Sequence, residues 1–338
     1  MNIKKHEEKI INWIDPFSKK KLKVGKNSLF SKNSTYLVTN GIPNFVNNEI
    51  NLKQKQVQKS FEEKWTNTTF AQNDEEFEKD IKPIYLKMMG LNPKDLKLFN
   101  EKLVLELGIG SGSSSRLWAS QAAEFHGIDI SKSIFSVSKT LRNLETDIIL
   151  SQADLNHLPY ENESFDIIVS NGVLHHTPNT KTSIKNTLKK LKKGGLYIFY
   201  IYKKKSPIRE FSDDYVREKI SGLSYSDAIK TMKSFTEFGK SLSEQKIQIN
   251  IPKDMELLGI KKGKYDLQRF VYYNFFKCFW NKSWGYDYSN MVNFDWYHPK
   301  FCWRHSETEI KSWCTELNLK IKYIKEVESG YACMLQKK

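Results

Sequence analysis

The chain has 338 residues, with 54 Lys and Arg against 39 Asp and Glu, and so a formal net charge of +15. This length accommodates one α/β domain of ordinary size and additional segments. No run of about eighteen apolar residues occurs, so no transmembrane helix is predicted. Residues 1–8 include two glutamates and no apolar stretch, so no signal peptide is predicted either.

The charge and the cysteines bear on partners and compartment. Lys far outnumbers Arg and is spread along the chain beside abundant Asn and Ile. This favours a compositional bias over a phosphate-reading patch, which typically clusters Arg. A nucleic-acid partner stays open but is not favoured, and the oligomeric state is not predicted. The cysteines form no C-x-x-C pair, which favours reduced thiols in a cytoplasmic protein.

Residues 1–50 predict a small β module. Trp13–Ser18, Tyr36–Val38 and Asn40–Phe45 are short apolar stretches bounded by turn residues, a pattern typical of short strands.

Residues 51–100 predict a helical lead-in. Val57, Phe61 and Trp65 recur every four residues and form one apolar stripe. A second apolar set predicts another helix, interrupted near Pro83; it comprises Phe77, Ile81, Ile84 and Met88.

The central motif runs from Val104 to Gly112. Its first half is apolar apart from Glu106, as expected for a strand that is buried on both faces. Its second half has Gly108, Gly110 and Gly112, and glycine permits positive φ and a close approach of the backbone to a ligand. Residues 113–122 have helical spacing. Strand, glycine turn and helix together are typical of a nucleotide-binding α/β unit.

Asp129 ends a second apolar run about twenty residues later, where a carboxylate can accept both hydroxyls of a ribose. The glycine spacing argues against a dinucleotide, because the third glycine of G-x-G-x-x-G would fall at Ser113.

These residues resemble the class I S-adenosylmethionine (SAM)-dependent methyltransferases, particularly the type related to ubiquinone biosynthesis. Further segments of residues 101–202 continue the resemblance in family order: Ala153–Leu155, Leu158–Tyr160, Ser164–Val169, Asn171–His176 and Leu188–Gly195. The resemblance implies an α/β fold with a Rossmann-like seven-stranded sheet whose last strand is antiparallel. Helices over Ser131–Leu144 and Thr182–Lys193 and a fifth strand over Leu196–Tyr202 are expected.

The resemblance also implies SAM as cofactor and assigns its contacts. The backbone of the three glycines passes under the methionine and ribose parts, Asp129 binds the ribose hydroxyls, and Ile130 is a further cofactor-binding residue. Asp154 and Leu155 contact the adenine. The main chain of Asn171 and Gly172 faces the methionine end. Glu106 binds polar groups near the turn, or alternatively caps it.

Five residues are candidate acid–base groups that would act on the acceptor. His175 and His176 follow the fourth strand, where a general base could act. Tyr297, His298 and His305 are alternatives. Related enzymes bind a metal here through added carboxylates, but Gly172 and His175 occupy those positions, so no metal is expected.

Residues 206–300 are predicted to be a helical, aromatic insertion that forms a substrate cap, with a helix over Ala228–Phe238. Residues 301–338 return to the core, with residues 101–205. Ser306 and Glu309 form a capping box before a last helix, and Leu319–Val327 and Tyr331–Leu335 form a hairpin.

Residues 1–50 further resemble the zinc-ribbon-like domain that precedes some methyltransferases. Asp15 and Ser18 stand where thiolates would bind zinc, so we expect a metal-free module.

The predicted function is methyl transfer from SAM to a small molecule enclosed by the 206–300 segment. Methylation of rRNA or tRNA is the alternative, suggested by the charge and the amino-terminal module, although no N-P-P-[YF]-like motif occurs. A non-catalytic SAM-binding scaffold is a third possibility.

Overall fold

The computed structural model describes residues 13–46, 51–67, 75, 77–141 and 143–338. The region examined for a signal peptide, residues 1–8, lies outside these. The described residues fall into two compact units. The sheet unit is drawn from Met1–Asn51, Trp65–Lys203 and Trp303–Lys338, and the inserted unit from Leu52–Lys64 and Lys204–Cys302. No helix among the described residues is both long and apolar enough to cross a membrane.

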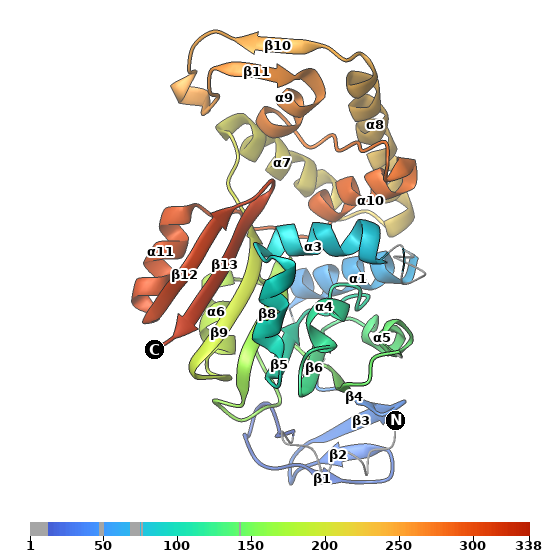
Figure 1. The fold of residues 1–338 in the computed structure, drawn as a ribbon. Helices are drawn as coiled ribbons and strands as arrows, with labels where there is room; N and C mark the ends of the chain where they lie inside the picture. Colours follow the sequence, from blue (N-terminus) through green and yellow to red (C-terminus); the bar gives the residue numbers. More distant parts are fainter. Residues whose placement is uncertain (1–12, 47–50, 68–74, 76, 142) are drawn as a thin grey trace. The chain divides into compact units, whose positions relative to one another are not determined.

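A seven-stranded sheet organises the sheet unit (Figure 1). The strand order is β12-β13-β9-β8-β5-β6-β7. All neighbouring pairs are parallel except those of β13, which runs antiparallel to both β9 and β12. The strands are β5 (Leu103–Leu107), β6 (Glu124–Asp129), β7 (Asp147–Gln152), β8 (Phe165–Asn171), β9 (Leu191–Tyr202), β12 (Leu319–Glu326) and β13 (Gly330–Lys337). The predicted sheet, with its antiparallel last strand, is confirmed.

The central strands are buried because their side chains alternate between two apolar clusters. On β5, Leu105 and Leu107 belong to one cluster and Val104 to the other. This period of two places an apolar layer on each face of the sheet. It explains why Glu106 is the single polar residue of β5.

Three helices of the sheet unit are shorter than the sequence predicts, namely α4 (Arg116–Ala119), α5 (Ile134–Thr140) and α6 (Thr180–Leu188). The last helix is α11 (Glu307–Glu316). The prediction of a helix over residues 113–122 is wrong in length, because α4 covers only Arg116–Ala119. Residues 111–115 form turns instead, because serine side chains here bond locally, as Ser111 does with Ser113.

The fifth strand starts earlier than expected. β9 begins at Leu191, so the predicted helix end at Lys193 is wrong, and α6 ends at Leu188. Phe165 faces Leu191 whereas Ile167 faces Leu196, so residues 192–195 bulge within the strand. Gly194, with φ of 75°, lies in this bulge and supplies the backbone freedom that it requires.

The last helix begins as predicted. The Ser306 side chain accepts a hydrogen bond from the Glu309 N–H at 3.2 Å, and the Ser306 N–H donates to Glu309 Oε2 at 2.9 Å. This reciprocal pair satisfies two free donors of the first turn.

The lead-in contains a junction at the expected place. A π-helical turn, η2 (Phe77–Ile81), passes into α3 (Lys82–Met89), with Pro83 near the start of α3. Pro83 is tolerated there because the first turn needs no N–H donor from it. A 3₁₀ helix, η3 (Pro93–Phe99), leads to β5.

The amino-terminal module is a four-stranded antiparallel sheet of β1 (Lys23–Val24), β2 (Ser28–Phe30), β3 (Thr35–Thr39) and β4 (Ile42–Pro43). Its Asp15 carboxylate accepts hydrogen bonds from the N–H groups of Phe17 and Ser18 and from the Ser31 hydroxyl, each at 2.9 Å. Burial opposes ionisation of Asp15, but these bonds and one from Ser34 outweigh it and lower its pKa to about 2. An ionised carboxylate thus organises this turn.

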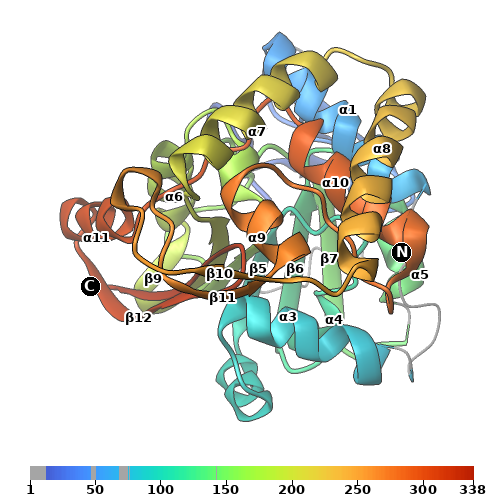
Figure 2. The same ribbon diagram turned by 90° about the horizontal axis from the view of Figure 1, so that it is seen from above.

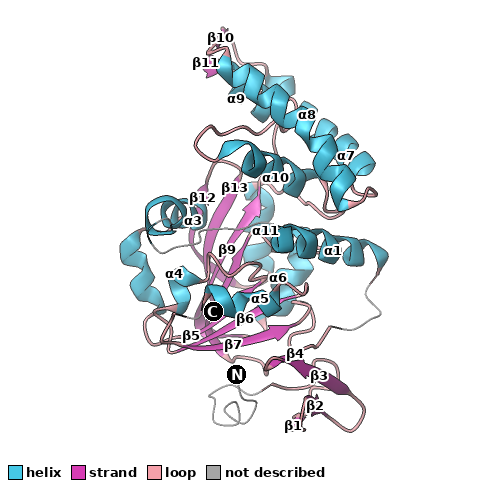
Figure 3. Ribbon diagram, turned by 90° about the vertical axis from the view of Figure 1, so that its right-hand side faces the viewer, coloured by secondary structure: helices cyan, strands magenta, loops and turns pink. Residues whose placement is uncertain are grey.

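The inserted unit is mainly helical (Figures 2 and 3). It contains the residues of α1 (Leu52–Asn67) up to Lys64, together with α7 (Pro207–Ile220), α8 (Tyr225–Glu244), α9 (Leu267–Asn274), α10 (Gly285–Tyr297) and a hairpin of β10 (Gln248–Ile251) and β11 (Gly263–Asp266). α8 is longer than the predicted 228–238, because Ser224 caps its start by accepting from the Asp227 N–H.

Candidate cofactor site

The glycine turn after β5 has left-handed backbone at all three predicted positions. The φ angles of Gly108, Gly110 and Gly112 are 70°, 56° and 79°. A Cβ on Gly108 would lie 2.4 Å from Val173 Cγ2, and one on Gly110 would lie 2.8 Å from the ring of Trp65. Both conformation and space therefore require glycine here.

Asp129, at the end of β6, is joined directly to this turn. Its Oδ2 accepts from the Gly110 N–H at 2.9 Å, and its Oδ1 accepts from the Ser131 N–H at 2.8 Å and the Ser131 hydroxyl at 2.7 Å. The sequence did not single out Ser131, although it lies two residues after the acid. The carbonyl of Ile130, a further predicted cofactor-binding residue, accepts from Gln152 Nε2.

Glu106 is buried behind the turn. Its carboxylate accepts from the Trp118 indole at 2.8 Å and from the Ser114 hydroxyl at 3.2 Å. Burial raises its pKa to about 7, against the hydrogen bonds from Ser115, Trp118 and Ser114. These contacts support the alternative in which Glu106 holds the turn and α4, and binding of the cofactor by Glu106 stays a prediction.

Asp154 and Leu155 follow β7 next to Asp129. The Ala153 N–H donates to the Asp129 carbonyl at 2.9 Å, which ties the two loops together. Both Asp154 and Leu155 are buried, and Asp154 Oδ1 accepts from the Asn156 N–H at 2.9 Å. The predicted adenine contacts thus lie one strand away from the predicted ribose contact.

Asn171 ends β8, and Gly172 follows it. The Asn171 Oδ1 atom is buried and finds no hydrogen-bond donor within the described ranges. Gly172 has a φ of 75°, and a Cβ built on it would meet nothing within 4 Å. An unsatisfied amide oxygen beside open space fits a ligand that brings its own donors.

Two of the candidate bases lie in a short 3₁₀ turn, η4 (Leu174–His176). His175 is fully buried, and within the described part of the chain neither of its ring nitrogens has a hydrogen-bond partner. Its ring centroid lies 3.8 Å from that of Tyr202 and 4.3 Å from that of His176. Burial, with the nearby His176 and His305, lowers the pKa of His175 well below its ordinary value, so this imidazole is neutral.

His305 belongs to the same end of the sheet. Its Nε2 pairs with the Thr180 hydroxyl at 2.9 Å, and the neighbouring Trp303 N–H donates to the His175 carbonyl at 2.9 Å. The structure therefore brings His175, His176 and His305 together near the carboxyl ends of β8 and β9, which the sequence had left as separate candidates.

Tyr297 and His298 lie in the inserted unit and are engaged within it. The Tyr297 hydroxyl donates to Asp213 Oδ1 at 2.9 Å and accepts from the Lys277 N–H at 2.8 Å. The His298 ring pairs with the Ser60 hydroxyl and the Leu223 carbonyl. Their proposed part in acid–base chemistry stays a prediction.

The geometry fits SAM. Three glycines, the carboxylate of Asp129 and an amide oxygen without a donor among the described residues all lie at the carboxyl edge of a parallel sheet, where α/β folds bind their ligands. The strand order with β13 inserted antiparallel beside β9 defines the class I methyltransferase fold.

The comparison with known families agrees. Residues 105–199 match the family model described as "Methyltransferase domain", so the chain contains a SAM-dependent methyltransferase domain of class I.

The chain is also similar to individual methyltransferases. Ubiquinone biosynthesis O-methyltransferase of Coxiella burnetii is 30% identical over 126 residues, which cover 35% of this chain and 52% of that protein. Phosphoethanolamine N-methyltransferase 2 of Caenorhabditis elegans is 28% identical over 33% of this chain and 28% of that protein. The match thus spans about half or less of these relatives.

Among solved structures, magnesium protoporphyrin IX methyltransferase from Synechocystis with bound SAM is similar over 87% of this chain and all of that chain. Its sequence identity is 12% and the TM-score is 0.46, which supports no statement about substrate.

Proposed function

We propose that the protein transfers the methyl group of SAM to a small-molecule acceptor. The observation that carries this proposal is the hydrogen bond from the Gly110 N–H to Asp129. It joins the glycine turn to the carboxylate that we assign to the ribose, and this supports a site for an adenosine-bearing cofactor.

When bound, SAM supplies an electrophilic methyl group on a sulfonium, so the protein's task is positioning. Asp129 accepts the ribose hydroxyls, Asp154 and Leu155 flank the adenine, and Asn171 Oδ1 accepts from the amino group of the methionine part. Positioning an acceptor in line with the methyl–sulfur bond supplies on the order of 7–11 kcal/mol of the rate acceleration.

The histidines supply the proton chemistry in this proposal. His175 is neutral, and within the described part of the chain neither of its ring nitrogens is hydrogen-bonded. Its unprotonated nitrogen is therefore available to accept the proton of an acceptor hydroxyl, as a base weaker than a free imidazole. His176 and His305 are the alternatives beside it, and Tyr297 and His298 remain candidates from the inserted unit.

The acceptor-binding part is assigned to residues 206–300. This segment lies in the chain between the fifth strand and the last helix, and all of it belongs to the inserted unit, whose interior is rich in aromatic contacts. Such an interior suits an organic acceptor.

Methylation of RNA is the second candidate, supported by the net charge of +15. Labelled SAM would be incubated with the protein and with separate small-metabolite and RNA fractions. Label in the small-molecule fraction supports the proposal, whereas label in RNA, retained in a salt-sensitive manner, establishes the alternative. Calorimetry showing SAM binding with no transfer to any fraction would favour a scaffold.

A further inference from the structure

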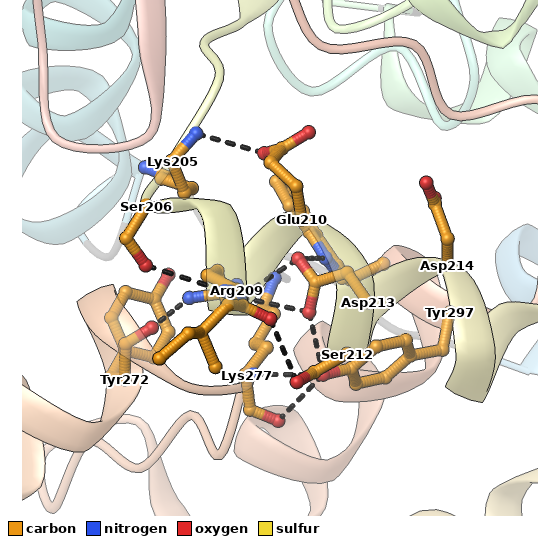
Figure 4. Close-up of polar contacts among 12 residues, drawn as sticks. Lys205, Ser206, Arg209, Glu210, Ser212, Asp213, Asp214, Tyr272, Lys277 and Tyr297 are labelled. Carbon is orange, nitrogen blue, oxygen red and sulfur yellow. Dashed lines mark hydrogen bonds and ion pairs between the residues drawn. The ribbon is translucent and has the colours of Figure 1, made fainter. Parts of the chain in front are cut away.

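A buried charged cluster occupies the middle of the inserted unit (Figure 4). Arg209, on α7, is completely buried. Its Nε donates to both oxygens of Asp213 at 2.8 Å, and its Nη1 donates to the carbonyl of Tyr272. Its Nη2 is buried and finds no acceptor among the residues that the structure describes. The Nη2 nitrogen of the guanidinium therefore has N–H donors without an acceptor among the described residues.

The Asp213 carboxylate is fully hydrogen-bonded and, among the described residues, does not pair with a second cation. Besides Arg209, it accepts from the Trp296 indole at 2.7 Å and from the Tyr297 hydroxyl at 2.9 Å. Both of its oxygens are thus taken by donors, and its single negative charge balances the charge of Arg209.

Lys277 is a second buried cation in the same place. Its side chain is 5% exposed, and its Nζ lies 4.6 Å from the centroid of the Trp296 ring. The Arg209 guanidinium lies 5.4 Å from the centroid of the same ring. Within the described ranges, Nζ has no hydrogen-bond acceptor; the nearby carboxylate of Asp295 pairs with Lys64 at 2.9 Å.

Burying donors of this kind without acceptors is costly, and most buried polar groups in proteins are satisfied. Among the described residues, Arg209 Nη2 is buried without an acceptor, and the Lys277 amine lies beside the same indole ring with no acceptor there. Asp213 is the carboxylate that is hydrogen-bonded in the cluster. An anionic group from outside the chain would satisfy both donors and offset the excess positive charge.

We propose that Arg209 Nη2 and Lys277 Nζ bind the carboxylate of a small apolar acid, and, resting on the function proposed above, that this acid is the methyl acceptor. Two donor nitrogens from two side chains match the two oxygens of a carboxylate. A phosphate has more oxygens and more charge to satisfy than this cluster offers. The surroundings are apolar, since Phe235 packs against Tyr297 and Phe276.

Protonation of the Lys277 amine provides a second measurable signal of anion binding. Burial lowers its pKa to about 7, with the charge of Asp295 opposing and that of Arg209 adding to this shift. Other charged or titratable groups that act on it are Asp213 and Cys302. At pH 8 most of the Lys277 amine is neutral, and a bound carboxylate favours its charged form. Binding at pH 8 therefore takes up a proton, and binding at pH 6 does not.

The test uses benzoate as the probe with the full chain, at constant ionic strength. Calorimetry in two buffers of different ionisation enthalpy measures affinity and proton uptake at pH 6 and pH 8. We expect wild-type protein to bind benzoate about tenfold more weakly at pH 8 than at pH 6, with an uptake close to one proton at pH 8.

Variants locate the site. Lys277→Met should lose at least tenfold in benzoate affinity together with the proton uptake, while Lys277→Arg retains binding without the uptake. Lys230, exposed on α8, provides the control, and Lys230→Met should change neither. The melting temperature of each variant verifies folding. Unchanged benzoate binding in folded Lys277→Met, or inorganic phosphate binding as tightly as benzoate, would overturn the proposal.

The same samples separate this site from the proposed function. SAM binding is measured in parallel. Benzoate binding that depends on Lys277 in a protein that does not bind SAM leaves the anion site standing and refutes the methyltransferase proposal. SAM binding without any benzoate binding refutes the anion site and leaves the methyltransferase proposal standing.

Discussion

The two units of the molecule build their polar sites in different ways. In the sheet unit, Asp129 bonds to Ser131 and Gly110, two and nineteen residues away. In the inserted unit, Asp213 bonds to Trp296 and Tyr297, which are 83 and 84 residues away. The first site is a local consequence of strand ends and tight turns. The second exists only after α7 and α10 have packed, so its residues carry no motif.

The largest expected effect lies in the inserted unit. Asp213→Asn leaves the buried Arg209 guanidinium without its counter-ion, which should lower the free energy of unfolding by about 3–5 kcal/mol. Denaturant titration measures this. Asp214→Asn is the control, because Asp214 is largely exposed in its pair with Arg217 and such pairs contribute about 0–1 kcal/mol. Equal effects of the two substitutions would contradict the role given to Asp213.

Asp129→Asn tests the sheet unit in the complementary way. The variant retains the shape of the side chain but loses the charge that accepts from the Gly110 N–H and that we propose binds the ribose hydroxyls, so SAM affinity should fall about 100-fold, or roughly 3 kcal/mol. Calorimetry with SAM measures it, with Asp147→Asn, at an exposed position of β7, as the control. Affinity within threefold of wild type would remove the basis of the proposed function.

Glu106→Gln sharpens the distinction between binding and scaffolding roles at the turn. The pKa of Glu106 is raised in the folded state to about 7, so the folded chain holds the proton more tightly than the unfolded chain. Wild-type stability therefore falls as pH rises from about 4.5 to 7. The variant lacks this loss, and from pH 5 to pH 8 its stability should rise relative to wild type by on the order of 1–3 kcal/mol.

The measurement is urea unfolding of both proteins at several pH values. A relative stability that is independent of pH would contradict the burial assigned to Glu106. A 100-fold loss of SAM affinity in the variant would instead restore the predicted direct contact with the cofactor.

The smallest effect is expected in the amino-terminal module. The pKa of Asp15 is lowered to about 2, so its ionised form stabilises the fold above pH 4, and this contribution is lost as pH falls toward 2. Asp15→Asn should cost about 1–2 kcal/mol at pH 6, and the cost should shrink by pH 3. A constant cost across that range would show that the turn depends on shape rather than charge.

Where the sequence predicted well, contacts are short-range or repetitive. The capping box of Ser306 and Glu309 and the alternation along β5 and β13 follow from neighbouring residues. Where it failed, a competing interaction decided the outcome. Serine side chains replaced the start of the helix expected at 113–122 with turns, and pairing of Leu191 with Phe165 of β8 starts β9 before the expected Leu196.

The sequence by itself determined the parallel sheet, the glycine turn and the acid at position 129, because backbone geometry and buried strands restrict which residues can occupy these positions. Only the tertiary structure decided which histidines meet at the ends of β8 and β9, and that Arg209 and Lys277 approach the same indole ring. These groups are brought together by packing of segments distant in the chain, and such packing depends on the fit of many side chains at once rather than on any local pattern.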